Sequence, residues 1–262
     1  MPSEFATPAF VLHTRAYGES DRIVTLLTEQ YGKITGIAKG AKNSRRRFGG
    51  TLEPFIHIRV VFQSRASSDL VFLLRCELLQ THRSFTQDLD RYGAGSYVLE
   101  LTDRMVLGRE SGRDVYRLLH DAIALLDAGA PPTSLLRAFD LHLLGMSGYA
   151  PAFDRCRSCG EAVVSATSYL SVDRGGLLCR ACVRPGEVVR PVGATTARLL
   201  ALLAAAPLAG AATVASDFPQ GDAMLDEAAV IAEQLLSAVT SGPVRSRAFL
   251  ARTRVDSTHP LR

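Results

Sequence analysis

Four of the five cysteines in this 262-residue sequence fall into two closely spaced pairs, and this spacing constrains the fold more than any other feature. Each pair has the form Cys-x-x-Cys, with nineteen residues between the pairs: Cys156 and Cys159, then Cys179 and Cys182. Two thiolates so close in sequence lie on one tight turn, and two such turns complete a tetrahedral four-cysteine site. The spacing therefore predicts one structural zinc ion in an insertion over residues 151–191.

The residues around the cysteines fit such a site. Gly160 directly follows the first pair and supplies the positive φ that this kind of turn favours. Between the pairs, Tyr169–Val172 and the glycines Gly175 and Gly176 predict a small β-hairpin. Four thiolates leave no open position for water on the metal, so the site is expected to be structural and not catalytic. The fifth cysteine, Cys76, lies in an apolar run and is expected to be buried.

The first 80 residues predict a small β-barrel. Five apolar or β-branched runs of strand length alternate with turn signals. These runs are residues 10–15, 22–28, 34–39, 55–62 and 70–76. Five strands in about seventy residues fit a small closed barrel, and the OB-fold is a common barrel of this size that binds single strands.

After residue 84 the apolar residues change to a helical spacing. Three such runs include Tyr92, Val115 and Leu135, and two more cover residues 195–206 and 222–240. The whole pattern predicts an α+β multidomain protein. Its expected parts are a five-stranded OB-fold barrel (1–80), an α-helical domain (81–150 and 192–244), the zinc-binding insertion (151–191) and a basic C-terminal tail (245–262).

The net charge of +4 hides a basic N-terminal part. No acidic residue lies between Glu29 and Glu53, whereas six basic residues do: Lys33, Lys39, Lys42, Arg45, Arg46 and Arg47. Clustered cations bind a nucleic-acid backbone by displacing its counterions, so these six are candidate DNA-binding residues; the alternative is a solvated loop. Tyr31 and Phe48 flank the cluster and either stack on bases or pack beneath the loop. A second basic cluster, at residues 245–254, is weaker evidence because chain ends are often charged.

No catalytic machinery is indicated. The sequence has no Walker-type glycine loop, no Gly-x-Ser-x-Gly elbow and no His-Glu-x-x-His motif, and its six histidines are scattered singly. The first residues do not resemble a signal peptide, and the most apolar stretch, residues 199–215, is too short to span a bilayer. We therefore expect a cytoplasmic protein that is not an enzyme, does not contact membranes and keeps its cysteines out of disulfides.

Several stretches carry a resemblance to a known family. They are Gly18-Glu-Ser-Asp-Arg-Ile-Val-Thr-Leu-Leu-Thr28, Tyr31-Gly-Lys33, Ala38-Lys-Gly-Ala-Lys42, and Leu144-Gly-Met-Ser-Gly-Tyr-Ala-Pro151 leading into the first cysteine pair. With the predicted barrel and the cysteine pairs, they resemble the RecO family of bacterial recombination mediators in DNA repair, over nearly the whole chain. Some members of that family lack the complete cysteine set, whereas this sequence has all four.

The resemblance implies an OB-fold that binds single- and double-stranded DNA. It also implies annealing of complementary strands without ATP, partnership with RecR, and binding to the C-terminal tail of single-strand DNA-binding protein. Together these activities would load RecA onto gaps in DNA associated with the nucleoid. The residues themselves leave an alternative open, a zinc-ribbon adaptor for protein interactions with only weak electrostatic contact to DNA.

Overall fold

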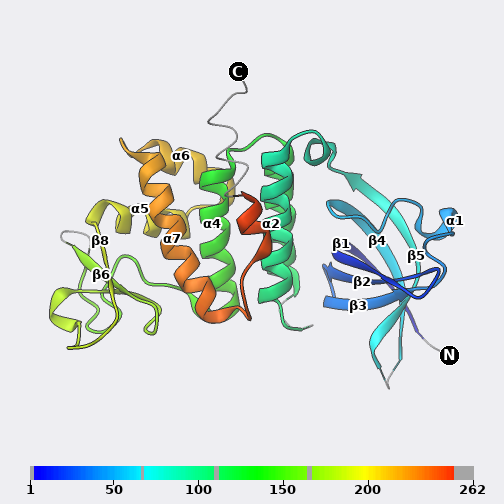
Figure 1. Ribbon diagram of the computed structural model, residues 1–262, viewed down its shortest axis with the longest axis horizontal. Coiled ribbons are helices and arrows are strands. Elements are labelled where there is room, and N and C mark those ends of the chain that lie inside the picture. Colours follow the sequence, from blue (N-terminus) through cyan, green and yellow to red (C-terminus); the bar gives the residue numbers. More distant parts are fainter. Residues whose placement is uncertain (1–2, 66–67, 109–111, 164–166, 251–262) are drawn as a thin grey trace. The chain divides into compact units, whose positions relative to one another are not determined.

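The computed structural model describes residues 3–65, 68–108, 112–163 and 167–250 (Figure 1). The chain forms two compact units. Unit 1 consists of residues 1–128 and 244–262, and unit 2 consists of residues 129–243. Unit 2 is therefore an insertion between two segments of unit 1.

The first part of unit 1 is a closed five-stranded barrel (Figure 1). Its strands are β1 (Glu4–Tyr17), β2 (Asp21–Thr28), β3 (Gly32–Ala38), β4 (Ile56–Arg65) and β5 (Ser68–Thr81). They follow one another around the barrel in the order β1-β2-β3-β5-β4, and β4 pairs back onto β1. β3 and β5 are parallel and the other neighbours are antiparallel, which is the connectivity of an OB-fold. The predicted barrel is confirmed.

The barrel is held together by alternate residues that point into a shared apolar core. β3 shows the alternation most clearly, since buried and half-buried positions follow one another along the strand. The core cluster includes Val24, Leu26, Ile34 and Val60, all of them buried. Cys76 belongs to the same cluster, and burial raises the pKa of its thiol to about 12, so it is the buried, unreactive cysteine that the sequence predicts.

Between β3 and β4 lies a long loop with one short helix, α1 (Arg45–Phe48). Phe48 is 3% exposed and packs in the barrel core. Tyr31 packs edge-on against the rings of Phe5 and Phe62, with ring centroids 5.4 Å apart in both pairs. Phe48 therefore packs beneath the loop, the second of the two roles considered for it. Tyr31 also packs inward, but in the turn between β2 and β3, at the opposite end of β3 from the loop.

Two helices of the predicted helical domain belong instead to unit 1 with the barrel. They are α2 (Leu89–Met105) and α3 (Gly112–Asp127), and α2 follows a 3-10 turn, η1 (Arg83–Thr86). Ala9 and Val11 face the barrel core, so Phe10 between them faces outward, yet it is fully buried. Its ring stacks on His57 and lies 5.8 Å from the ring of Tyr116 in α3. The apolar outer face of the barrel thus needs these helices, and the compact unit that contains the barrel extends to residue 128.

Unit 2 contains the remaining helices and the cysteine segment. Its elements are α4 (Pro132–Leu144), a π-helical turn η2 (Gly145–Tyr149), β6 (Ser168–Ser171), β7 (Gly176–Leu178), a 3-10 turn η3 (Arg180–Cys182), β8 (Arg190–Val192), α5 (Ala194–Ala205), a 3-10 turn η4 (Leu208–Gly210), α6 (Ala211–Ser216) and α7 (Gly221–Val239). α4 is the central helix, because it is buried along almost its whole length and contacts α5, α6 and α7. Arg137 and Asp140 of α4 are both buried, and Nη2 of Arg137 lies 3.1 Å from Oδ2 of Asp140. This ion pair compensates for the cost of burying the two charges.

The last described residues return to unit 1 and dock on α2; we call residues 244–250 the C-terminal clasp. The carboxylate of Glu100 in α2 accepts hydrogen bonds from the backbone N–H groups of Arg245 (2.9 Å) and Ser246 (2.8 Å) and from the Ser246 hydroxyl (2.7 Å). Arg104 donates to the same carboxylate. The clasp accounts for part of the predicted basic tail, and residues 251–262 lie outside the described residues.

These contacts predict that Glu100 holds the clasp in place. Burial alone raises the pKa of Glu100, but its hydrogen bonds outweigh burial and bring the pKa below its usual range. The carboxylate therefore stabilises the fold above its unfolded pKa, and this contribution is lost as the pH falls through the folded value. We expect Glu100→Gln to lower the free energy of unfolding at neutral pH by about 1 kcal/mol and to weaken this acid dependence, measured by urea unfolding. Identical stability of both proteins at neutral pH would contradict the role.

A second titrating group lies under α3. His57 Nε2 is 2.6 Å from the hydroxyl of Tyr116, and burial, reinforced by His120 and His82, lowers the pKa of His57 to about 4. His57 is therefore neutral in the folded protein, whereas the unfolded chain takes up a proton near the ordinary value of about 6.5. Stability is then full above that value and is lost as the pH falls towards about 4.

We expect His57→Gln to remove part of this pH dependence, because glutamine keeps a hydrogen-bonding side chain but does not titrate. The measurement is the urea midpoint of both proteins at pH values above and below about 6.5. The wild-type midpoint should fall on acidification by more than that of the variant. An equal fall in both would show that other groups carry the dependence.

Candidate metal centre and nucleic-acid interface

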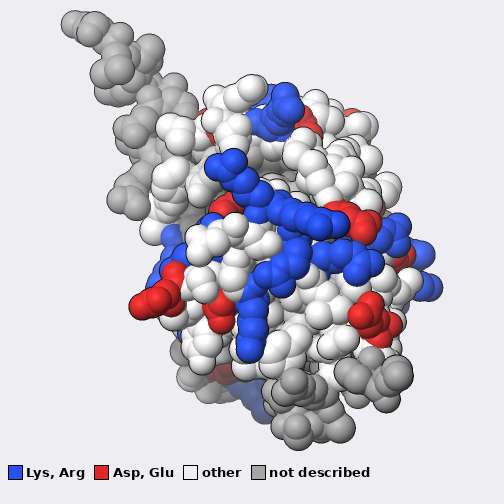
Figure 2. All heavy atoms as spheres, turned by 90° about the vertical axis from the view of Figure 1, so that its right-hand side faces the viewer, with Lys and Arg blue, Asp and Glu red and all other residues white. Residues whose placement is uncertain are grey.

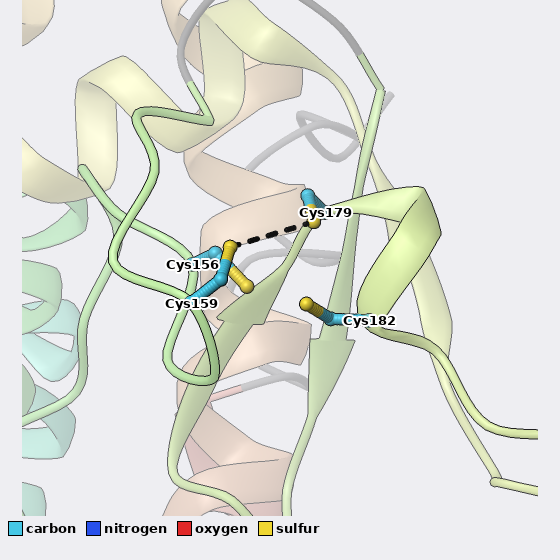
Figure 3. A group of neighbouring side chains, drawn as sticks. All are labelled: Cys156, Cys159, Cys179 and Cys182. Carbon is cyan, nitrogen blue, oxygen red and sulfur yellow. Dashed lines mark hydrogen bonds between the residues drawn. The ribbon is translucent and has the colours of Figure 1, made fainter.

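The four paired cysteines converge on one point in unit 2 (Figure 3). Cys156 and Cys159 come from the loop before β6, Cys179 follows β7, and Cys182 ends η3. Their Sγ atoms all lie within 4.8 Å of one another, and those of Cys159 and Cys179 are 3.8 Å apart. Four sulfurs at a Zn–S distance of about 2.3 Å would lie about 3.8 Å from one another in a tetrahedron. The donor set therefore fits a single tetrahedral metal ion.

Backbone hydrogen bonds shape the first cysteine turn. The N–H of Gly160 donates to the carbonyl of Cys156 at 2.9 Å, and Gly160 has a φ of +78°, as the sequence predicts. Burial raises the pKa of the Cys156 thiol, but backbone N–H groups of Cys159, Cys179 and Ser158 outweigh this effect and lower it to about 6. These N–H groups thus favour the thiolate of Cys156, the form that binds a metal, whereas the neighbouring thiol of Cys179 raises the pKa of Cys182 to about 12.

The predicted hairpin between the cysteine pairs is also present. β6 pairs antiparallel with β7 and, on its other edge, with β8. The first turn is joined to this sheet where the N–H of Arg157 donates to the carbonyl of Leu177 at 2.7 Å. A sheet of three very short strands buries little surface, so an ion shared by the two turns would be its main internal support.

The second candidate site is the end of the barrel that carries α1. Figure 2 shows Lys and Arg side chains gathered in a band across this face of the molecule. Five of the six predicted DNA-binding residues lie on the segment between β3 and β4 (residues 39–55); we call its residues 39–53 the basic loop. All five are exposed: Lys39, Lys42, Arg45, Arg46 and Arg47.

The structure places the sixth residue, Lys33, apart from these five. Lys33 lies at the opposite end of β3 from Lys39, a separation of about 20 Å along the strand. Its ammonium group donates to both the carbonyl and the carboxylate of Asp103 in α2, and its side chain is only 20% exposed. Lys33 therefore joins the barrel to α2. Its partner is seventy residues away in sequence, so the charge pattern alone could not indicate this role.

Hydrogen bonds fasten the basic loop to the turn between β1 and β2. The ammonium group of Lys42 donates to the carbonyl oxygens of Gly18 (3.2 Å) and Glu19 (2.8 Å). The N–H of Gly40 donates to the carboxylate of Asp21 at 2.8 Å. The loop is therefore held in a defined position on the barrel and does not depend on DNA to order it.

The three consecutive arginines of α1 differ in their surroundings. Arg47 is used inside the loop, since it donates to the carbonyl of Lys39 at 2.7 Å and to the hydroxyl of Ser44 at 3.1 Å. Within the described part of the chain, no hydrogen bond or ion pair reaches the side chain of Arg45 or Arg46. Their guanidinium groups therefore remain open to an anion from solution.

Sequence reasoning missed Arg22, which lies at the start of β2 beside the basic loop. Its Nη1 pairs with the carboxylate of Glu53 at 2.8 Å, and it lines the same hollow as Lys42 and Arg45. Arg22 lies outside the acid-free window that selected the candidates. Its place in the resembling stretch 18–28, next to the turn, was the signal that could have indicated it.

Comparison with known proteins decides the family. One family model, Recombination protein O N terminal, matches residues 1–82, and a second, Recombination protein O C terminal, matches residues 86–248. The chain belongs to the RecO family. Membership gives this chain a role in DNA repair and recombination, as the resemblance implied.

Curated relatives agree with the family models. A DNA repair protein RecO from Geobacter metallireducens is 36% identical over 250 residues, which cover 95% of this chain and 98% of the relative. The RecO proteins of Syntrophus aciditrophicus (35% over 199 residues; 75% and 77%) and a Nocardioides strain (38% over 200 residues; 75% and 81%) are similar in the same way. In the described part of the chain, no helix has both the length and the apolar character of a membrane span.

The cysteine geometry of this RecO family member predicts about one metal ion per chain. We expect Cys156→Ser to remove most of the bound metal and to expose the β6–β7 hairpin to hydrogen exchange, because one thiolate and its turn are lost. Metal is measured by elemental analysis of protein purified without chelator. Cys76→Ala is the matched control, since that cysteine lies in the barrel core, and it should keep the metal. Equal metal content in both variants would contradict the site.

Proposed function

We propose that this RecO family member is a recombination mediator that binds single- and double-stranded DNA through its basic loop. It anneals complementary strands without ATP and, with RecR, helps to load RecA onto gaps coated by single-strand DNA-binding protein. The observation that carries this proposal is the band of exposed cations on an OB-fold barrel (Figure 2), including two arginines without a described acidic partner. It would act in the cytoplasm, in association with the nucleoid.

The mechanism follows from the electrostatics of the basic loop. Two complementary strands are both polyanions, so bringing them together costs repulsion that a cationic surface offsets. Binding should therefore depend strongly on salt and little on sequence. The chain has no tryptophan, and Phe48 is buried, so phosphate contacts and not base stacking supply most of the affinity. No bond in the DNA is broken, and the protein is not an enzyme.

The metal that we assign to the four cysteines is a single zinc ion with a structural role. Four thiolates in tetrahedral arrangement are the donor set typical of structural zinc. Since the protein supplies all four ligands, the ion would not activate water but would hold the two cysteine turns together.

We place the tail of single-strand DNA-binding protein in a groove of unit 2 between α4 and α5. The groove has a volume of about 540 Å³, and most of its lining is apolar, including Leu141, Met146, Phe153 and Ala201. An apolar groove fits the hydrophobic residues of that tail. RecR is the other protein partner that we propose.

The alternative is a zinc-ribbon adaptor whose basic loop only meets acidic partners. It predicts tight protein complexes together with weak DNA binding and no acceleration of annealing. The exposed Met146 and Tyr149 in η2 are the observation that favours this role, because exposed apolar side chains are common at protein interfaces.

An annealing assay separates the two functions. Two complementary labelled oligonucleotides are mixed with the protein without ATP, at low and moderate salt. We expect duplex formation to accelerate, and the acceleration to fade with salt, because cations on the basic loop bind the phosphates. If folded, metal-loaded protein does not accelerate duplex formation, the result contradicts the recombination mediator and supports the zinc-ribbon adaptor.

A double variant tests the basic loop itself. We expect Arg45→Ala with Arg46→Ala to weaken binding to single strands and to lower the salt slope by about 1 to 1.5, since each lost phosphate contact removes about 0.7. Arg47 is left in place because it holds the loop together. The control is Arg113→Ala with Arg117→Ala, which removes the same charge from exposed positions on α3. Equal slopes in the two double variants would refute the assignment.

A further inference from the structure

The basic loop encloses a hollow of about 180 Å³ at the surface of the barrel. Three separate elements contribute cations to its lining: Arg22 from the start of β2, Lys42 from the loop after β3, and Arg45 from α1. Glu53 is the one acidic residue of the lining. Three cations and one carboxylate give the hollow a formal charge of +2.

Two of these cations are held in position by contacts that leave the hollow positive. Lys42 is fixed by two backbone carbonyl oxygens, which carry no formal charge to neutralise it. Arg22 is fixed by an ion pair with Glu53, whose carboxylate oxygen lies 2.8 Å from Nη1 of Arg22. The only carboxylate of the lining is therefore already paired with Arg22. The Ser44 hydroxyl, also in the lining, accepts from Arg47, which leaves its own hydrogen free to donate into the hollow.

Arg45 is the cation of the lining whose side chain is available to bind an anion. Its side chain is exposed and has no ion-pair or hydrogen-bond partner among the described residues. Arg46, the next residue of the same short helix, does not line the hollow. The side chains of consecutive helical residues point about 100° apart, so Arg45 can face the hollow while Arg46 points away from it.

We propose that this hollow binds one phosphate group, with Arg45, Lys42 and the Ser44 hydroxyl as its ligands. The proposal rests on the proposed function, since the phosphate would come from bound DNA. A volume of about 180 Å³ takes a group of several atoms with some water, because one water occupies about 30 Å³. Arginine is well suited to a tetrahedral oxyanion, since its planar guanidinium donates two parallel hydrogen bonds. A bound phosphate would fix the strand at one point on the barrel while the rest of the band binds it loosely.

Two sources of phosphate share this chemistry. An internal phosphodiester carries one negative charge, whereas the terminal phosphate of a strand carries nearly two. A formal charge of +2 suits the terminal group better, because each further unit of charge adds attraction at short range.

The first experiment compares two single variants that remove the same charge from adjacent positions. Binding of inorganic phosphate to the full chain is measured by isothermal titration calorimetry for the wild type, Arg45→Ala and Arg46→Ala. We expect Arg45→Ala to weaken phosphate binding about tenfold, the loss of a charge-assisted hydrogen bond, and Arg46→Ala to weaken it less than twofold. Equal weakening in both would show a diffuse electrostatic field and would overturn the hollow as a site.

A third variant changes the affinity in the opposite direction. Glu53→Gln removes the one carboxylate of the lining, so phosphate should bind several-fold more tightly than in the wild type. Since Arg22 then loses its charged partner, circular dichroism and thermal unfolding establish that the variant is folded before binding is compared. Unchanged or weaker phosphate binding by folded Glu53→Gln would count against the hollow.

The second experiment identifies the source and separates this inference from the proposed function. Oligonucleotides with a 5′-phosphate or a 5′-hydroxyl are titrated against the wild type and Arg45→Ala. A preference for the 5′-phosphate that Arg45→Ala abolishes identifies a terminal phosphate, and equal binding that Arg45→Ala weakens more than Arg46→Ala identifies an internal one. Binding of DNA with no difference between Arg45→Ala and Arg46→Ala would retain the proposed function and overturn the hollow. Binding of inorganic phosphate without DNA binding would do the reverse.

Discussion

Closure of the barrel by the pairing of β1 with β4 is the constraint on which the candidate DNA-binding surface depends. Seven residue pairs, from Glu4 with Gln63 to Phe10 with His57, join the first strand to the fourth. Closure leaves the segment between β3 and β4 to cross one end of the barrel, where Phe48 anchors it in the core. The cations of the basic loop are then fixed by hydrogen bonds to the β1–β2 turn. A surface built in this way meets a nucleic acid already organised, so little conformational entropy is lost on binding.

The cations of this protein show how little formal charge reveals about role. Lys33 is bound to α2, Arg47 stabilises the loop that carries it, and Lys42 is held by backbone carbonyls. Arg45 and Arg46 are the two of these five whose side chains have no hydrogen-bond or ion-pair partner among the described residues. A count of lysines and arginines treats all five alike, whereas their contacts separate those that maintain the fold from those that are open to a ligand.

Local patterns in the sequence predicted the features that depend on neighbouring residues, such as strands and turns. They did not predict contacts between residues that are far apart in the sequence. The cysteine spacing and Gly160 define a turn within a few residues, so the sequence could predict that these four cysteines converge on one candidate metal centre. Strand length and turn signals likewise gave the barrel. The grouping of α2 and α3 with the barrel depends on the outward-facing Phe10, and an apolar run does not show which of its faces a helix will cover. The contact of Lys33 with Asp103 could not be predicted for the same reason, because the two residues are close only in the folded chain.

The position of the C-terminal clasp at the end of the chain determines the order in which the two units can be completed during synthesis. A ribosome makes the barrel, α2 and α3 first, then the whole of unit 2, and only afterwards the residues that dock on Glu100. Until those residues are made, the carboxylate of Glu100 and the ring of Tyr92, which later meets Phe249, face water on the nascent chain. Unit 1 is therefore the first part of the protein to begin folding and the last to be finished. A chain interrupted anywhere within unit 2 would carry a barrel with its candidate DNA-binding loop already formed but with one face of α2 left uncovered.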